Sequence, residues 1–185
     1  MKIKTVTIYC LFFLFFCHSI VLSKDLSSEK KNLEDFSYYA DKGNRGEQLT
    51  TEEFKILMQK LENILLEVKK AFSEISIRGA DFSYEIGKSW EMELDMTRES
   101  IENALKVLNA LKEKPNSIRL SVGLHCYLAH IDNEGLVFER VERFAKIIKP
   151  SRFNLRLWTI AFEKAHLLFL AIAKDKGKDL YEKKK

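Results

Sequence analysis

Apolar residues recur every three or four positions along most of the chain, which is the spacing of one face of an α-helix. Two segments show it most regularly and predict helices over about 50–76 and 90–114. Thr50 and Glu53 have the spacing of a capping box at the start of the first helix, and Pro115 ends the second. The stripe positions are Phe54, Leu57, Leu61, Ile64, Val68 and Phe72, then Trp90, Leu94, Thr97, Ile101, Ala104, Leu108 and Leu111.

Residues 118–131 have a less decisive pattern, because their apolar positions alternate as in a buried strand. A helix is equally permitted, and no second segment offers a strand to pair with this one. We therefore predict a helix over 117–131. Two more amphipathic segments predict helices over 135–149 and 151–177, separated by Pro150.

These segments predict an all-α fold, a five-helix bundle over residues 49–185. The composition agrees, since 7 Gly and 2 Pro among 185 residues leave little material for the turns of an all-β protein. Of the 3 cysteines, Cys10 and Cys17 lie near the N-terminus and Cys126 lies in the bundle. The folded part therefore cannot close a disulfide of its own.

The N-terminus has the pattern of an export signal. Lys2 and Lys4 precede an apolar run over residues 8–16, so residues 1–23 predict a signal peptide. Cleavage would follow Ser23, or would precede Cys17 as in a lipoprotein. Residues 24–48 are polar and predict a flexible tether.

Charge is spread unevenly over the bundle. Residues 50–114 carry 10 basic and 13 acidic side chains, whereas residues 150–185 carry 9 basic and 4 acidic ones. A basic helix and tail would attract phosphates, sulfated sugars or anionic lipid; a solvated tail that only maintains solubility is the alternative. The candidate anion-binding residues are Arg152, Arg156, Lys164, Lys174, Lys176, Lys178, Lys183, Lys184 and Lys185.

Catalytic chemistry has weak candidates. His125 and Cys126 are adjacent, so on a helix they point about 100° apart and cannot act as an aligned pair. His125 and His130 are five residues apart, not the four that would let both face one metal ion. We expect structural roles for these residues and for His166. We predict no enzyme activity, no cofactor, no metal and no nucleic-acid partner.

Several short segments mark the layout of residues 50–185. They are Glu67-Val68-Lys69-Lys70, Gly79-Ala80-Asp81-Phe82, Leu111-Lys112-Glu113-Lys114 with Asn116-Ser117, Asn133-Glu134-Gly135-Leu136, Lys149-Pro150 and the tail Lys183-Lys184-Lys185. In these segments and in the order of its helices, the chain resembles the decorin-binding adhesin lipoproteins of Lyme-group spirochaetes.

The resemblance implies a bundle tethered to the outer-membrane surface through a lipidated Cys17, which binds decorin glycosaminoglycan through lysines. Two departures limit what carries over. Phe16 is bulkier than the residue usual before a lipidated cysteine, and Glu91, Glu93 and Asp95 stand where relatives tend to be basic. Only the basic fifth helix and tail have counterparts.

The sequence thus predicts a surface-exposed or secreted adhesin, a monomer or weak dimer, that binds host proteoglycan. One alternative is a module that captures a host plasma protein, such as a complement regulator, on an apolar or mixed helix face. Another is a carrier that holds an apolar ligand among Phe144, Trp158, Phe162 and Phe169, although such residues are more often ordinary core.

Overall fold

The computed structural model of the protein describes residues 31, 33–77 and 83–175. The chain divides into two compact units, Met1–Tyr38 and Tyr39–Lys185, and the second contains the helical bundle. The predicted signal peptide over residues 1–23 and the end of the basic tail, residues 176–185, lie outside the described residues.

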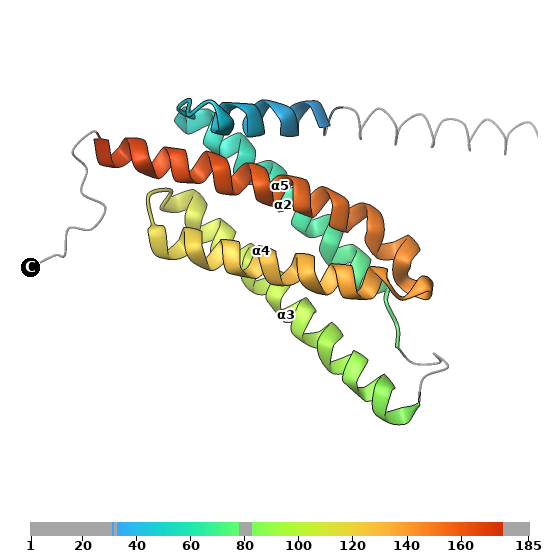
Figure 1. Ribbon diagram of the computed structural model, residues 1–185. Coiled ribbons are helices and arrows are strands. Elements are labelled where there is room, and N and C mark those ends of the chain that lie inside the picture. Colours follow the sequence, from blue (N-terminus) through green and yellow to red (C-terminus); the bar gives the residue numbers. More distant parts are fainter. Residues whose placement is uncertain (1–30, 32, 78–82, 176–185) are drawn as a thin grey trace, which may run out of the picture. The chain divides into compact units, whose positions relative to one another are not determined.

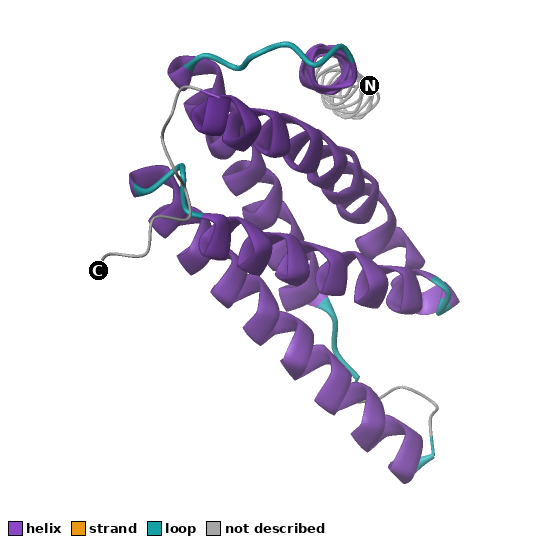
Figure 2. Ribbon diagram, turned by 60° about the vertical axis from the view of Figure 1, so that its left-hand side comes forward, coloured by secondary structure: helices purple, strands orange, loops and turns teal. Residues whose placement is uncertain are grey.

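Four long helices make up the bundle: α2 (Thr51–Glu74), α3 (Tyr84–Glu113), α4 (Ile118–Glu139) and α5 (Glu142–Asp175). α2 and α4 each pack against both α3 and α5 (Figure 1). A shorter helix covers residues 33–44, and every regular element in the described part of the chain is helical (Figure 2). The all-α prediction is therefore confirmed, and residues 118–131 are helical.

The predicted cap at the start of α2 is present. Thr50 Oγ1 accepts a hydrogen bond from the Glu53 amide over 3.1 Å, and the Thr50 amide donates to Glu53 Oε2 over 2.7 Å. Such a capping box satisfies amides that have no partner within the helix, a contribution of about 1 kcal/mol. Ser117 caps α4 in a similar way through the Leu120 amide.

Phe138 on α4 lies at the centre of the aromatic core. Its ring contacts one aromatic ring from each of the other three helices: Phe72 of α2, Trp90 of α3 and Phe144 of α5, with ring centroids 5.0 to 5.9 Å apart. Phe72, Phe138, Phe144, Trp158 and Phe162 are all fully buried. Three of the four residues considered for an apolar ligand thus belong to the packed core, and nothing is described of the Phe169 side chain.

The predicted break between the third helix, 117–131, and the fourth, 135–149, is misplaced, because the chain breaks after Glu139. α4 continues through residues 132–135 to Glu139. The reason is that Ile131, Gly135 and Phe138 are buried and extend the inward spacing past the polar turn-like segment. Gly135 also accommodates Arg152 of α5, because a Cβ there would lie 3.3 Å from the Arg152 side chain.

The predicted break at Pro150 is wrong too, since Pro150 lies inside α5. A proline in a helix interior removes one backbone hydrogen bond and costs about 3 kcal/mol. Phe144, Ile148, Leu155 and Trp158 are buried on both sides of it, so one continuous apolar stripe holds the helix together. The predicted helices over 135–149 and 151–177 are therefore the end of α4 and a single α5.

Two other boundaries differ. α3 begins at Tyr84 rather than near residue 90, so its first turns occupy part of the predicted loop. Residues 33–44 of the predicted tether are helical, and the bundle unit begins at Tyr39 rather than at residue 49. Tyr39 and Ala40 are buried, and the Tyr39 ring lies 6.2 Å from that of Trp158. This small apolar patch, the Lys42–Glu53 ion pair and the Lys164–Asn44 hydrogen bond together hold a segment whose composition is mostly polar.

Candidate functional site

Arg152, one of the predicted anion ligands, is engaged within the protein. Its Nε lies 3.4 Å from Asp132 Oδ1, and its Nη1 lies 3.2 Å from Glu139 Oε2. The Nε also donates to the Asp132 carbonyl oxygen over 3.3 Å, and the side chain is only 13% exposed. Arg152 thus joins α5 to the last turns of α4, which leaves its guanidinium poorly placed to meet a large anion.

The other predicted cations fall into three groups. Lys164 Nζ donates to Asn44 Oδ1, so this lysine connects α5 to the end of the helix over residues 33–44. Arg156 is exposed on α5. Lys174 lies in α5 with a side chain that the structure does not describe, and Lys176, Lys178, Lys183, Lys184 and Lys185 lie outside the described residues.

A basic surface that the sequence analysis missed lies on the N-terminal half of α5. Residues 140–156 contain six Arg or Lys and a single acid, Glu142. At 100° per residue, Lys146, Lys149, Phe153 and Arg156 fall within about 80° of the helix circumference. All four are exposed, as is the nearby Arg143, and Phe153 has 55% of its surface in solvent. We call Arg143, Lys146, Lys149, Phe153 and Arg156 the basic face.

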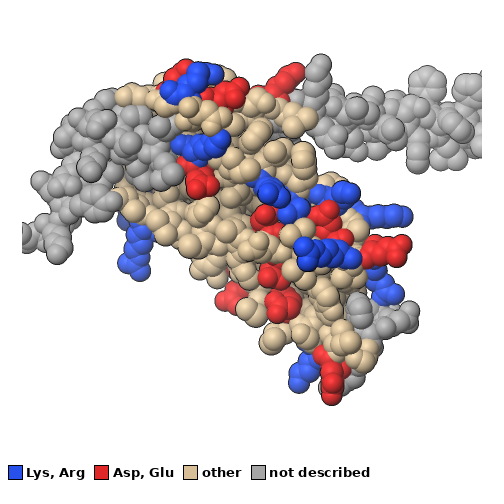
Figure 3. Space-filling view, in the orientation of Figure 1, with Lys and Arg blue, Asp and Glu red and all other residues tan. Residues whose placement is uncertain are grey.

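The basic face is the solvent side of the stripe that buries Phe144, Ile148, Leu155 and Trp158. Its cations extend over about 20 Å of helix at 1.5 Å per residue. Figure 3 shows Lys and Arg side chains, with acidic ones among them, gathered toward the end of the bundle where α5 begins. The spacing is present in the sequence. However, the predicted break at Pro150 placed Arg156 in a different helix from Lys146 and Lys149.

Arg98 of α3 fixes the end of α2. Its Nη2 donates to the carbonyl oxygens of Phe72 and Ile75 over 3.0 and 3.1 Å, and its Nη1 donates to Asp95 over 3.3 Å. The last carbonyls of a helix have no partner within the helix, so the guanidinium takes the place of the missing amides. Arg98 thereby positions the first half of α3 relative to α2.

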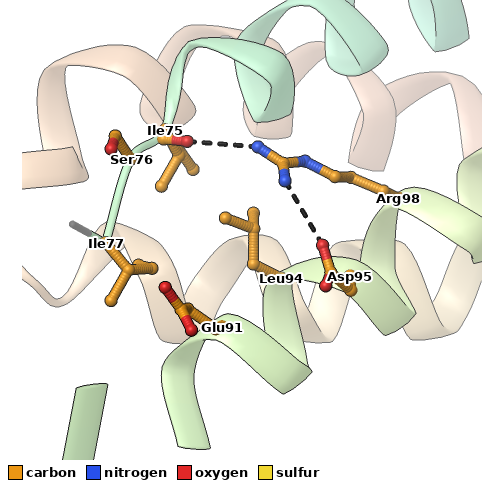
Figure 4. A pocket seen from close by; sticks show the side chains of 7 residues that line it. All are labelled: Ile75, Ser76, Ile77, Glu91, Leu94, Asp95 and Arg98. Atoms are coloured by element: carbon orange, nitrogen blue, oxygen red, sulfur yellow. Dashed lines mark hydrogen bonds and ion pairs between the residues drawn. The ribbon is translucent and has the colours of Figure 1, made fainter. Parts of the chain in front are cut away.

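A pocket of about 330 Å³ lies beside this contact (Figure 4). Buried Ile75, Ile77 and Leu94 supply its apolar lining, and Glu91 and Asp95 supply carboxylates. The Arg98 guanidinium also lines the pocket and donates to Asp95, so the lining carries charges of both signs.

A second hollow, of about 780 Å³, follows the solvent side of α3. Met92 and Met96 are 58% and 48% exposed there. We call this surface the acidic methionine face; its lining residues are Glu85, Lys88, Ser89, Glu91, Met92, Asp95, Met96 and Glu99.

His166 is a buried polar residue of the core. Its Nε2 must donate to the Pro115 carbonyl oxygen, 3.1 Å away, so its Nδ1 accepts from the Ser121 hydroxyl, 2.8 Å away. Burial lowers the pKa of His166 to about 4, against a smaller opposing effect of the Pro115 carbonyl. The residue is 1% exposed and its ring is neutral at pH 7, so His166 is a hydrogen-bonded histidine of the core.

The remaining chemical candidates are dispersed. Cys126 is exposed on α4, and His125 and His130 are partly exposed on the same helix. Burial raises the pKa of Glu134 on α4, and the neighbouring Glu93 carboxylate of α3 adds to this effect. In the described part of the chain, no group of three or more His, Cys, Asp or Glu side chains could hold a metal ion.

Fold and surfaces together define an all-α helical bundle with two charged outer faces. No family model, no curated protein and no solved structure matches the chain. A search of the described helices for one long and apolar enough to span a bilayer finds none.

Proposed function

We propose that the protein is a non-enzymatic adhesin, exposed on the cell surface, that binds sulfated glycosaminoglycan of the host matrix through the basic face of α5. The single observation that supports this most directly is the row of exposed cations on one side of that helix. Sulfated polysaccharides are linear polyanions, and several cations in a row engage them through charge-assisted hydrogen bonds.

Phe153 adds a contact of a different kind. Its exposed ring lies between Lys149 and Arg156 on the same side of the helix. An aromatic ring can cover the C–H face of a sugar while the flanking cations meet sulfate groups. In this proposal Lys174 and the lysines of the tail add to the cationic charge that attracts the polysaccharide, and the leader, with Cys17 as the lipid-bearing residue, delivers the bundle to the outer surface.

The test is elution from a heparin column of the protein lacking only its leader. We expect Lys146→Glu, Lys149→Glu and Arg156→Glu in one chain to lower the eluting salt concentration strongly. Each lost contact should reduce the slope of log affinity against log salt by about one, as for other polyanions. A second chain with Lys183, Lys184 and Lys185 replaced by Ser measures the share of the tail.

The matched control carries the same charge change on other exposed lysines: Lys55→Glu, Lys106→Glu and Lys114→Glu. Both triple variants have the same net charge, so a general charge effect moves them equally. Equal shifts would contradict a site on α5. A large shift confined to the tail variant would relocate binding to the C-terminus.

A further inference from the structure

The first half of α3 has an outer face that the other described helices leave exposed. Its inner stripe, with Leu94, Thr97 and Ile101, is buried. On the opposite side Met92 and Met96 are about half exposed, and at 100° per residue they lie in line with Glu85 and Glu99. This half of α3 projects beyond the other bundle helices in both views (Figures 1 and 2).

The charge of this segment is negative. Residues 84–99 contain five acids and two bases, Lys88 and Arg98. The Arg98 guanidinium is bonded to the end of α2 and to Asp95, so it offsets part of the charge within the protein. Glu85 and Glu99 remain exposed at the two ends of the methionine pair. A sulfated polysaccharide or an anionic membrane is repelled by such a surface.

We propose that the acidic methionine face is a docking site for a cationic amphipathic helix of a partner protein. Methionine side chains are flexible and polarisable, and they adapt to the apolar side of a helix. From Glu85 to Glu99 the face is about 21 Å long, which accommodates about four turns of helix. The partner helix presents apolar residues at positions i, i+4 and i+7 to the methionines, and Lys or Arg on its flanks to the carboxylates.

Charge complementarity selects this occupant. Arg98 fixes the root of the face against α2, so the docking surface is preformed rather than ordered on binding. The site is independent of the basic face, which has the opposite charge and lies on another helix. Polysaccharide binding and helix docking can therefore succeed or fail separately.

The probe is an 18-residue synthetic helix with leucines in a single stripe and lysines on both flanks, titrated into the protein lacking its leader. We expect this peptide to bind at least tenfold more tightly than a scrambled peptide of the same composition. We expect Met92→Ser with Met96→Ser to weaken binding about tenfold at unchanged net charge, and Glu85→Lys with Glu99→Lys to weaken it at least as much. Titration in isotope-labelled protein should move the methyl signals of Met92 and Met96.

Two controls locate the site. Val122→Ser removes an exposed apolar side chain from α4, and Glu52→Lys with Glu163→Lys repeats the charge change on α2 and α5. Both should bind the peptide as the parent does, and unchanged circular dichroism should show that every variant folds. Equal binding of the scrambled peptide, or no effect of the serine substitutions, overturns the proposal. So does self-association in sedimentation that the methionine variant and Lys149→Glu both abolish, because the occupant is then a second copy of this chain.

Discussion

The outer sides of α3 and α5 are built on similar inner stripes but carry opposite charges. Both helices bury a row of apolar residues, and both expose large apolar side chains: Met92 and Met96 on α3, and Phe153 on α5. Around these, α3 has mainly carboxylates and α5 mainly cations. Because the inner stripe supplies most of the packing, the outer positions can vary without loss of the core, and we propose above a different partner for each face. Changes to the core should therefore affect both faces together, and changes to either face should leave the other intact.

The largest expected effect is on the aromatic core that supports both faces. Phe138→Ala removes the ring that contacts α2, α3 and α5 and should lower the free energy of unfolding by about 3–5 kcal/mol. Urea denaturation followed by circular dichroism measures this loss. Phe138→Leu should cost clearly less, because it leaves a smaller cavity. If the alanine variant loses less than about 1 kcal/mol, the two faces do not depend on a shared core.

Acidification should weaken the same core through His166. The ordinary histidine pKa of 6.5 applies to the unfolded chain, and burial lowers it to about 4 in the fold. The unfolded chain then binds more protons between these values, so stability is complete above pH 6.5 and falls as the pH drops toward 4. The full loss is about 3 kcal/mol.

Urea denaturation at several pH values tests this dependence, with His166→Gln as the comparison. Glutamine can still hydrogen bond to its neighbours but does not titrate, so the variant should be less sensitive to pH between 6.5 and 4. Parallel curves for the two proteins would show that the pH dependence arises elsewhere. Glu134 has the opposite effect. Burial raises its pKa, so protonation of this group favours the folded chain as the pH falls.

Substitutions of Arg152 and Arg156 should have different effects. Arg152 holds α5 against α4, whereas Arg156 is an exposed cation of the basic face. Arg152→Ala leaves Asp132 and Glu139, both mostly buried, without their cation and should cost about 1–3 kcal/mol of stability. Arg156→Ala removes an exposed cation and should change stability by less than about 0.5 kcal/mol. Urea denaturation and heparin elution of both variants should give opposite rankings. The same ranking in both assays would mean that the two arginines have the same role.

Substitutions on either outer face should have the smallest effect on the free energy of unfolding. Phe153→Ser on α5 and Met92→Ser on α3 should each alter the unfolding free energy by no more than about 0.5 kcal/mol. Thermal denaturation monitored by circular dichroism should give superimposable curves for parent and variants. A loss above 1 kcal/mol in either variant would show that its face packs against another part of the chain.

Local sequence signals predicted much of the fold. The Thr50 and Glu53 cap and the stripes of α2 and α3 depend on neighbours three or four residues apart, so they could be recognised directly. Pro150 was misjudged because its local cost is outweighed by burial of Phe144 and Trp158 on both sides of it. The docking of Tyr39 depends on Trp158, more than a hundred residues away, and no local pattern reveals it.

The candidate site was predicted less well for the same reason. Charge identifies a cation but not its partner. Arg152 looked like Arg156 in the sequence, yet the fold places it between Asp132 and Glu139. The predicted anion-binding residues do not include Lys146 and Lys149, because the prediction ended a helix at Pro150 and the continuous α5 aligns these lysines with Arg156. The predicted lysines of the tail stay predictions.

Under the anchoring through Cys17 proposed above, the docking of residues 39–48 limits how far the bundle can stand from the membrane. Gly43 seats against Lys164 so closely that a Cβ there would lie 2.7 Å from the Lys164 Cβ. The ten residues 39–48 therefore belong to the folded part and not to the linker. An extended chain would cover up to about 3.5 Å per residue. In that proposal the maximum distance between the anchor and the bundle is shorter by about 35 Å, and a bulkier residue at position 43 should release the segment and restore this length.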